Sequence, residues 1–156
     1  MIRAALAVSV LVALGCSGSG GHIPAPPQGA VAVQPTTALS FHERADAFYQ
    51  RLIRRRFNAL ETFNDPFLRR HFRSVDLFFD YYAALAESLE EANFEKSRPT
   101  SVAVEEFVFE TPSTVRVQVR FGGDDDRPLR PTSTSVVRLD RWEREEESWW
   151  ITPGKL

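Results

Sequence analysis

Apolar residues recur at helical spacing in two long segments of the chain. The first runs from residue 41 to about residue 60, and Ser40 with Glu43 just at its start fits a capping box. The second follows Ser74, a residue type that caps helices, and continues to about residue 94. Its predicted apolar stripe comprises Val75, Phe78, Phe79, Tyr82, Leu85, Ala86, Leu89 and Phe94. The pattern therefore predicts two amphipathic helices in the first two thirds of the chain.

A shorter helix is predicted between these two, over residues 66–72. Asn64 or Asp65 can cap it, and proline, here Pro66, is favoured at the first helical position. The first long helix also carries a cluster of arginines at residues 51 and 54–56. Such a cluster could hold an anion or a lipid headgroup, but a solvated face paired with acidic residues elsewhere is the preferred interpretation.

From residue 101 onward the apolar positions alternate, which is typical of half-buried β-strands. Four strands are predicted, over residues 101–110, 115–121, 132–144 and 149–152, with a long hairpin loop over residues 122–131. The alternation slips at Glu105 and Glu106, which indicates a β-bulge. Consecutive strands with short links pair antiparallel. Helices followed by such strands predict an α+β fold.

Composition narrows the classes of function. The 156 residues are 43% hydrophobic, which suits one domain and excludes a wholly disordered chain. The formal net charge is −2, so no basic field indicates a nucleic-acid partner. The single cysteine excludes an internal disulfide and a cysteine-only zinc site. The sequence gives no basis for expecting a metal site or a cofactor.

The N-terminal segment has the pattern of an export signal. Arg3 precedes an uncharged apolar run over residues 4–14, which is shorter than the roughly 20 residues that span a membrane. Leu14, Gly15 and Cys16 follow directly. On these residues the chain resembles a bacterial lipoprotein precursor, although Ala13 stands where that family favours leucine.

The resemblance implies removal of residues 1–15 and acylation of Cys16, which would then anchor the protein in a membrane. Ser17 after the cysteine implies sorting to the outer membrane, facing the periplasm. The alternative is ordinary secretion to the periplasm, because residues 13–15 also fit a signal-peptidase site. Residues 16–39, rich in Gly, Ser and Pro, are predicted to be a flexible tether, and residues 40–156 the folded domain.

The order of helices and strands resembles the NTF2-like (cystatin-like, SnoaL-type) fold. Its C-terminal part carries the resemblance best: a strand over residues 136–142, a polar turn, and the Trp149–Trp150 strand. The resemblance implies that the helices pack on a curved antiparallel four-stranded sheet, which forms a cone with an internal pocket. Catalytic members place a His–Asp or Tyr–Asp pair inside this cone.

Candidate functional residues are few. His71, with Asp76 or Asp80 as an acidic partner, is a candidate for a catalytic pair, because a general base needs a titratable group within reach of its proton. The tryptophans at 142, 149 and 150 are candidates for contact with a ligand or partner. Adjacent strand residues point to opposite faces, so one of the last two should lie in the core.

Three functions remain open at this point. The first is an envelope lipoprotein whose domain binds a small apolar ligand or an envelope protein without catalysis. The second is a SnoaL-type enzyme, a hydrolase, isomerase or cyclase, that uses His71 with a nearby Asp. The third is a structural envelope component that forms homodimers or larger oligomers through its sheet.

Overall fold

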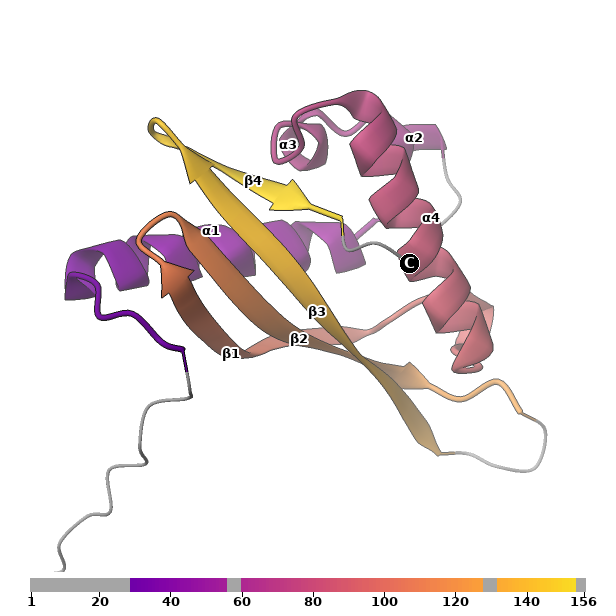
Figure 1. Ribbon diagram of the computed structural model, residues 1–156. Coiled ribbons are helices and arrows are strands. Elements are labelled where there is room, and N and C mark those ends of the chain that lie inside the picture. The colour runs from indigo at the N-terminus through magenta and orange to yellow at the C-terminus, as the bar shows by residue number, and fades with distance from the viewer. Residues whose placement is uncertain (1–28, 56–59, 128–131, 154–156) are drawn as a thin grey trace, which may run out of the picture.

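The computed structural model describes residues 29–55, 60–127 and 132–153. These residues form an α+β fold with one antiparallel sheet in the order β1-β2-β3-β4, which confirms the predicted class (Figure 1). The elements are α1 (Pro35–Ile53), α2 (Leu60–Phe63), α3 (Pro66–Arg69), α4 (Val75–Glu91), the 3-10 helix η1 (Glu95–Ser97), β1 (Ser101–Thr111), β2 (Thr114–Asp124), β3 (Ser133–Glu145) and β4 (Ser148–Thr152). The sheet is not closed, because β1 and β4 are its edges.

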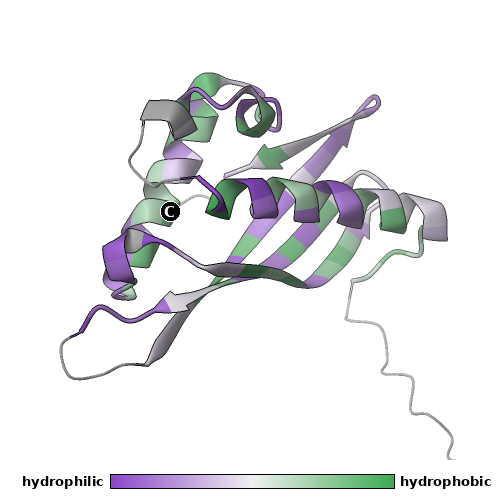
Figure 2. Ribbon diagram, turned by 180° about the vertical axis from the view of Figure 1, so that it is seen from behind, coloured by the Kyte–Doolittle hydropathy of each residue, from purple (hydrophilic) through white to green (hydrophobic). Residues whose placement is uncertain are grey.

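Helix α1 lies across one face of the sheet, which we call the covered face (Figure 2). The ring of Phe41 on α1 lies 4.8 Å from that of Trp149 and 5.7 Å from that of Trp142. Five side chains on the covered face of the two central strands are 0% exposed: Val115, Val117, Val119, Phe121 and Trp142. The opposite face, which includes Val137 and Leu139, we call the open face.

Helix α1 begins at Pro35 and not at residue 41, where the pattern predicted its start. Ser40 is not its cap; the Ser40 hydroxyl donates instead to the carbonyl of Thr37, inside the helix. Proline at the first helical position favours the earlier start, and Ala38 and Val33 pack against the core. The amide of Val31 also donates to the carbonyl of Phe109 at the edge of the sheet.

The predicted end of this helix at residue 60 is also wrong. Helix α1 ends at Ile53, where Arg54 and Arg55 interrupt the apolar stripe, and residues 60–63 form the separate helix α2. Helix α3 is shorter than predicted, since it ends at Arg69. Its predicted cap is confirmed, because the Asp65 side chain accepts from the amides of Phe67 and Leu68.

Helix α4 begins as predicted, with the Ser74 hydroxyl accepting from the amide of Leu77. It ends at Glu91 because Asn93 adopts a left-handed conformation (φ 57°), which lets the amide of Phe94 bond back to Leu89. Its buried stripe differs from the prediction. Phe79 is 37% exposed, whereas Tyr81 and Ala84, which were not in the predicted stripe, are buried.

The strands follow the predicted alternation, and the bulge between Val104 and Glu106 is confirmed. Strand β2 is longer than predicted and continues through Gly122 and Gly123, where a loop was expected. A Cβ on Gly123 would lie 2.7 Å from the Phe94 ring, so the glycine lets this ring pack directly on the strand. The two glycines therefore extend the sheet rather than ending it.

Candidate functional site

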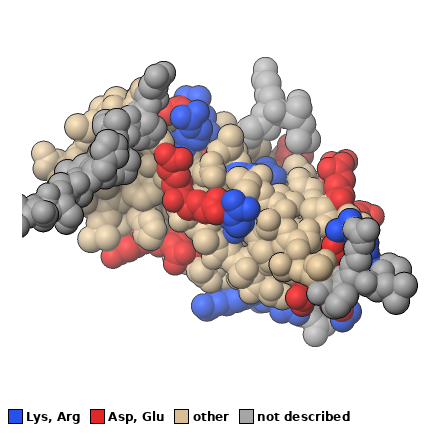
Figure 3. Space-filling view, turned by 90° about the horizontal axis from the view of Figure 1, so that it is seen from below, with Lys and Arg blue, Asp and Glu red and all other residues tan. Residues whose placement is uncertain are grey.

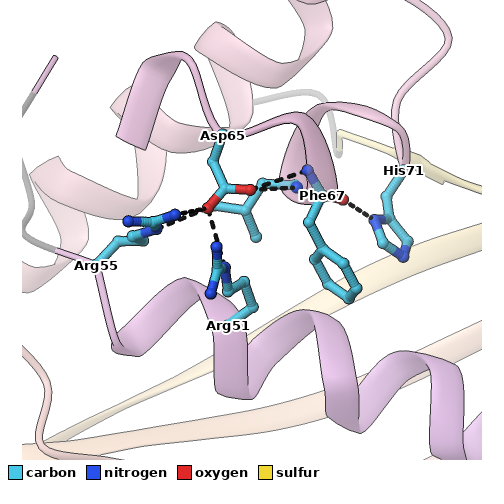
Figure 4. A network of polar contacts seen from close by, with 6 residues as sticks. Arg51, Arg55, Asp65, Phe67 and His71 are labelled. Carbon is cyan, nitrogen blue, oxygen red and sulfur yellow. Dashed lines mark hydrogen bonds and ion pairs between the residues drawn. The ribbon is translucent and has the colours of Figure 1, made fainter. Parts of the chain in front are cut away.

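His71 lies in the interior of the domain and is only 1% exposed. Its ring is 5.1 Å from that of Phe48 and 5.9 Å from that of Trp142. Its Nδ1 lies 2.8 Å from the Phe67 carbonyl oxygen, which can only accept, so Nδ1 carries the proton (Figure 4). Burial, together with the charges of Arg44 and Arg70, lowers the pKa of His71 to about 4 despite this hydrogen bond. The imidazole is therefore neutral at pH 7.

The structure does not bring His71 together with either predicted acidic partner. Asp76 and Asp80 are exposed on α4. Asp76 lies in the first turn of this helix, where the helix dipole stabilises a negative charge. Among the described residues, no carboxylate is hydrogen-bonded or ion-paired to His71. A general base must reach its proton, and this arrangement offers His71 no route to a substrate.

Asp65 joins α1 to α3 through a network of charged hydrogen bonds (Figure 4). Its Oδ2 accepts from Nε of Arg51 at 2.9 Å and from Nε of Arg55 at 2.6 Å, while its Oδ1 caps α3. Burial would raise the pKa of Asp65, but the hydrogen bonds from Arg55, Phe67 and Arg51 outweigh it and lower the pKa. Two of the clustered arginines are thus paired with an acidic residue, as the preferred interpretation of the cluster expected.

A second polar network, which the sequence analysis missed, lies at Asp140 on the covered face. Asp140 is 3% exposed, and its Oδ2 accepts from the hydroxyls of Tyr49 and Tyr81, both at 2.7 Å. Its Oδ1 accepts from Nε of Arg138 at 2.8 Å, and the Arg138 guanidinium lies 4.3 Å from the centre of the Tyr81 ring. The only indication in the sequence was that Asp140 stands two residues before Trp142, so the strand alternation places both on the same face of β3.

The Asp140 network connects elements rather than presenting a reactive group. It links β3 to α1 through Tyr49 and to α4 through Tyr81. Burial and the neighbouring Asp140 raise the pKa of both tyrosines well above the ordinary value, so both hydroxyls stay protonated and donate. Both carboxylate oxygens are already engaged within the protein. The network can position elements, but it offers no free base to a substrate.

The three tryptophans have different environments. Trp142 is 0% exposed and donates from Nε1 to the Tyr49 hydroxyl at 3.2 Å. Trp149 is 6% exposed, whereas Trp150, opposite Glu143 on β3, is half-buried. The expectation that one of the adjacent pair lies in the core is met by Trp149. Trp142 and Trp149 are core residues, so Trp150 retains more surface for a ligand or partner than either of them.

The open face carries exposed apolar side chains among ion pairs. Leu139 is 61% exposed and Val137 44%. Arg141 lies 3.3 Å from Glu143 on the same strand, Arg116 lies 3.6 Å from Glu110, and Arg120 pairs with Glu105 across β1 and β2. Two exposed apolar side chains therefore lie among charge-balanced ion pairs on this face.

Charge of one sign does not gather on the face seen in Figure 3, where acidic and basic side chains lie next to one another. Among the described residues there is no group of three or more His, Cys, Asp or Glu that could hold a metal ion. No helix in the described part of the chain is long and apolar enough to cross a membrane.

Comparisons with protein-family models, curated proteins and solved structures find no match for the chain.

Proposed function

We propose that the protein is a lipid-anchored lipoprotein of the bacterial envelope whose α+β domain binds a protein partner without catalysis. One observation carries the proposal: aromatic rings fill the covered face around His71, whereas Leu139 and Val137 are exposed on the open face. A filled interior argues against both a substrate cavity and a small apolar ligand within it. The exposed apolar side chains are then the feature that needs a partner.

The NTF2-like assignment belongs to this proposal. The order of helices followed by a four-stranded antiparallel meander supports it, as does the C-terminal hairpin with its tryptophans. In this interpretation, α1 and α4 occupy the concave side of the sheet, where Tyr49 and Tyr81 both bind Asp140. The aromatic filling is what distinguishes this domain from the catalytic members, whose cone encloses a pocket.

Membrane attachment through Cys16 is proposed from the sequence, since residues 1–28 lie outside the described residues. The expected location is the periplasmic side of the outer membrane, and secretion to the periplasm is the alternative. Cells fed a tagged fatty acid test the anchor. We expect the wild-type protein to take up the label and Cys16→Ser to lose it and leave the membrane fraction. A wild-type protein without label would contradict the anchor.

The choice of binding surface is tested with two leucines of equal exposure. Leu139 on the open face is 61% exposed and Leu39 on α1 is 60% exposed, so a charge introduced at either position has a similar effect on folding. In a deletion strain, we expect Leu139→Glu to abolish complementation and Leu39→Glu to preserve it. Equal complementation by the two folded variants would reject the open face.

The same strain separates binding from the two alternatives. His71→Gln should preserve function if His71 is only a core residue; loss of function in a folded His71→Gln protein would favour the SnoaL-type enzyme. Sedimentation of the purified wild-type protein tests the third function. A stable homodimer that Leu139→Glu dissociates would identify a second copy of the chain as the partner and favour the oligomerising component.

A further inference from the structure

A hollow of about 730 Å³ lies between the first turns of α1 and the β3–β4 hairpin. Helix α1 contributes Thr36, Ser40 and Arg44 to its lining, and the hairpin contributes Arg144 and Trp149. Its volume falls within the range of small-molecule sites, roughly 300–1,000 Å³. Neither Val137 nor Leu139 of the open face lines the hollow, so the hollow is a separate site from the proposed protein-binding surface.

Arg44 has a hydrogen-bond donor that the protein leaves unused. Its Nε is buried and has no hydrogen-bond partner among the described residues. A buried donor without an acceptor costs about 1–3 kcal/mol, so such groups call for an explanation. Burial lowers the pKa of Arg44, and the neighbouring charge of Arg70 lowers it further. Among the described residues, Arg44 is therefore a cation that forms no ion pair and whose Nε–H has no acceptor.

Arg144, on the hairpin, has only weak partners. Its Nη2 lies 3.5 Å from Oε2 of Glu147, whose side chain is 95% exposed, and its Nε donates to the Glu146 carbonyl at 3.2 Å. Exposed ion pairs of this kind contribute about 0–1 kcal/mol, so an incoming anion can replace Glu147 at little cost. The guanidinium then remains available to the hollow.

We propose that this hollow binds a small polar molecule through one carboxylate or phosphate group held between Arg44 and Arg144. A guanidinium presents paired N–H donors that match the oxygens of either anion. The Thr36 hydroxyl can donate to or accept from polar parts of the same molecule, and the Ser40 hydroxyl, which donates to Thr37, can accept. Glu43 and Glu147 also line the hollow, and their charges select against a ligand with several negative groups.

The test uses the mature protein as it is purified from cells, in detergent micelles, and follows the arginine Nε–H signals by NMR. Sodium acetate and sodium phosphate are the two probes, each titrated at constant ionic strength against sodium chloride. We expect the signals of Arg44 and Arg144 to shift and saturate with at least one probe, while that of Arg116 on the open face stays unchanged. Tighter binding of acetate indicates a carboxylate ligand, and tighter binding of phosphate indicates a phosphate ester.

Two variants make the outcome decisive. Arg44→Lys and Arg144→Lys keep the charge but lose the forked donors, so each should weaken binding about tenfold, whereas Arg116→Lys should not change it. A folded protein in which neither probe shifts Arg44 more than chloride does would overturn the proposal. Binding that survives both lysine variants unchanged would overturn it as well. Neither result bears on the open face, which has its own test.

Discussion

Two adjacent residues of β3 show how differently the two faces of the sheet are built. Asp140, a charged residue, is 3% exposed on the covered face, whereas Leu139, an apolar residue, is 61% exposed on the open face. Asp140 is buried at low cost because two hydroxyls and a guanidinium bind its carboxylate. Leu139 has no comparable enclosure. The comparison assigns stability to the covered face, and the proposed function assigns recognition to the open face.

The largest effect on folding is expected from Trp142 on the covered face. Trp142→Ala removes an indole that contacts Phe41, Phe48 and His71 and leaves a cavity, so the free energy of unfolding should fall by about 3–5 kcal/mol. Urea denaturation of both proteins measures the difference. A loss below about 1 kcal/mol would mean that the covered face is not the core of the domain.

The next effect is expected from the polar network on the same face. Asp140→Ala leaves the hydroxyls of Tyr49 and Tyr81 buried without an acceptor, which should cost about 2–4 kcal/mol. Tyr81→Phe in the Asp140→Ala background removes one unpaired donor and keeps the Tyr49 hydroxyl, which accepts from Nε1 of Trp142. This double variant should recover part of the lost stability, and a further loss instead would contradict the described network.

The covered face should also make stability depend on pH. The pKa of His71 is about 4 in the folded protein, against about 6.5 in an unfolded chain, so the unfolded state binds more protons between these values. The contribution of His71 is complete above pH 6.5 and declines by about 3 kcal/mol as the pH falls to 4. Denaturation at several pH values should show a steeper loss for the wild type than for His71→Gln. Parallel pH profiles would mean that folding does not change the pKa of His71.

The smallest effect on folding is expected on the open face. Leu139→Glu exchanges one exposed side chain for another, so the free energy of unfolding should change by no more than about 0.5 kcal/mol. The urea midpoint of Leu139→Glu, compared with that of Leu39→Glu, checks this. A loss comparable to that of Trp142→Ala would show that the open face is packed against something in the folded protein.

Much of the fold could be predicted from the sequence, because the signals were local. The caps at Asp65 and Ser74, the bulge next to Glu105 and the alternation on β3 all depend on residues close in the chain. The errors have two causes. The extension of β2 past Gly123 depends on packing against Phe94, which is distant in sequence, whereas the start of α1 at Pro35 follows a local proline signal that the sequence analysis missed.

The candidate site was less predictable for the same physical reason. The Asp140 network joins residues 91 and 59 positions apart, and nothing near Tyr49 or Tyr81 in the chain indicates that they share one carboxylate. The burial of His71 follows from three elements that close around it, so spacing to Asp76 or Asp80 could not show whether a catalytic pair forms. Only the opposite placement of Trp149 and Trp150 followed from strand geometry alone.

The central claim, that the open face binds a protein, is tested most directly by site-specific photocrosslinking in cells that make the protein. A photoreactive amino acid replaces Leu139 in one strain and the equally exposed Leu39 in another. We predict one adduct of defined mass from position 139, which Val137→Glu abolishes, and none from position 39. Adducts of the same yield from both positions, or none from position 139 in a stably folded protein, would contradict the claim.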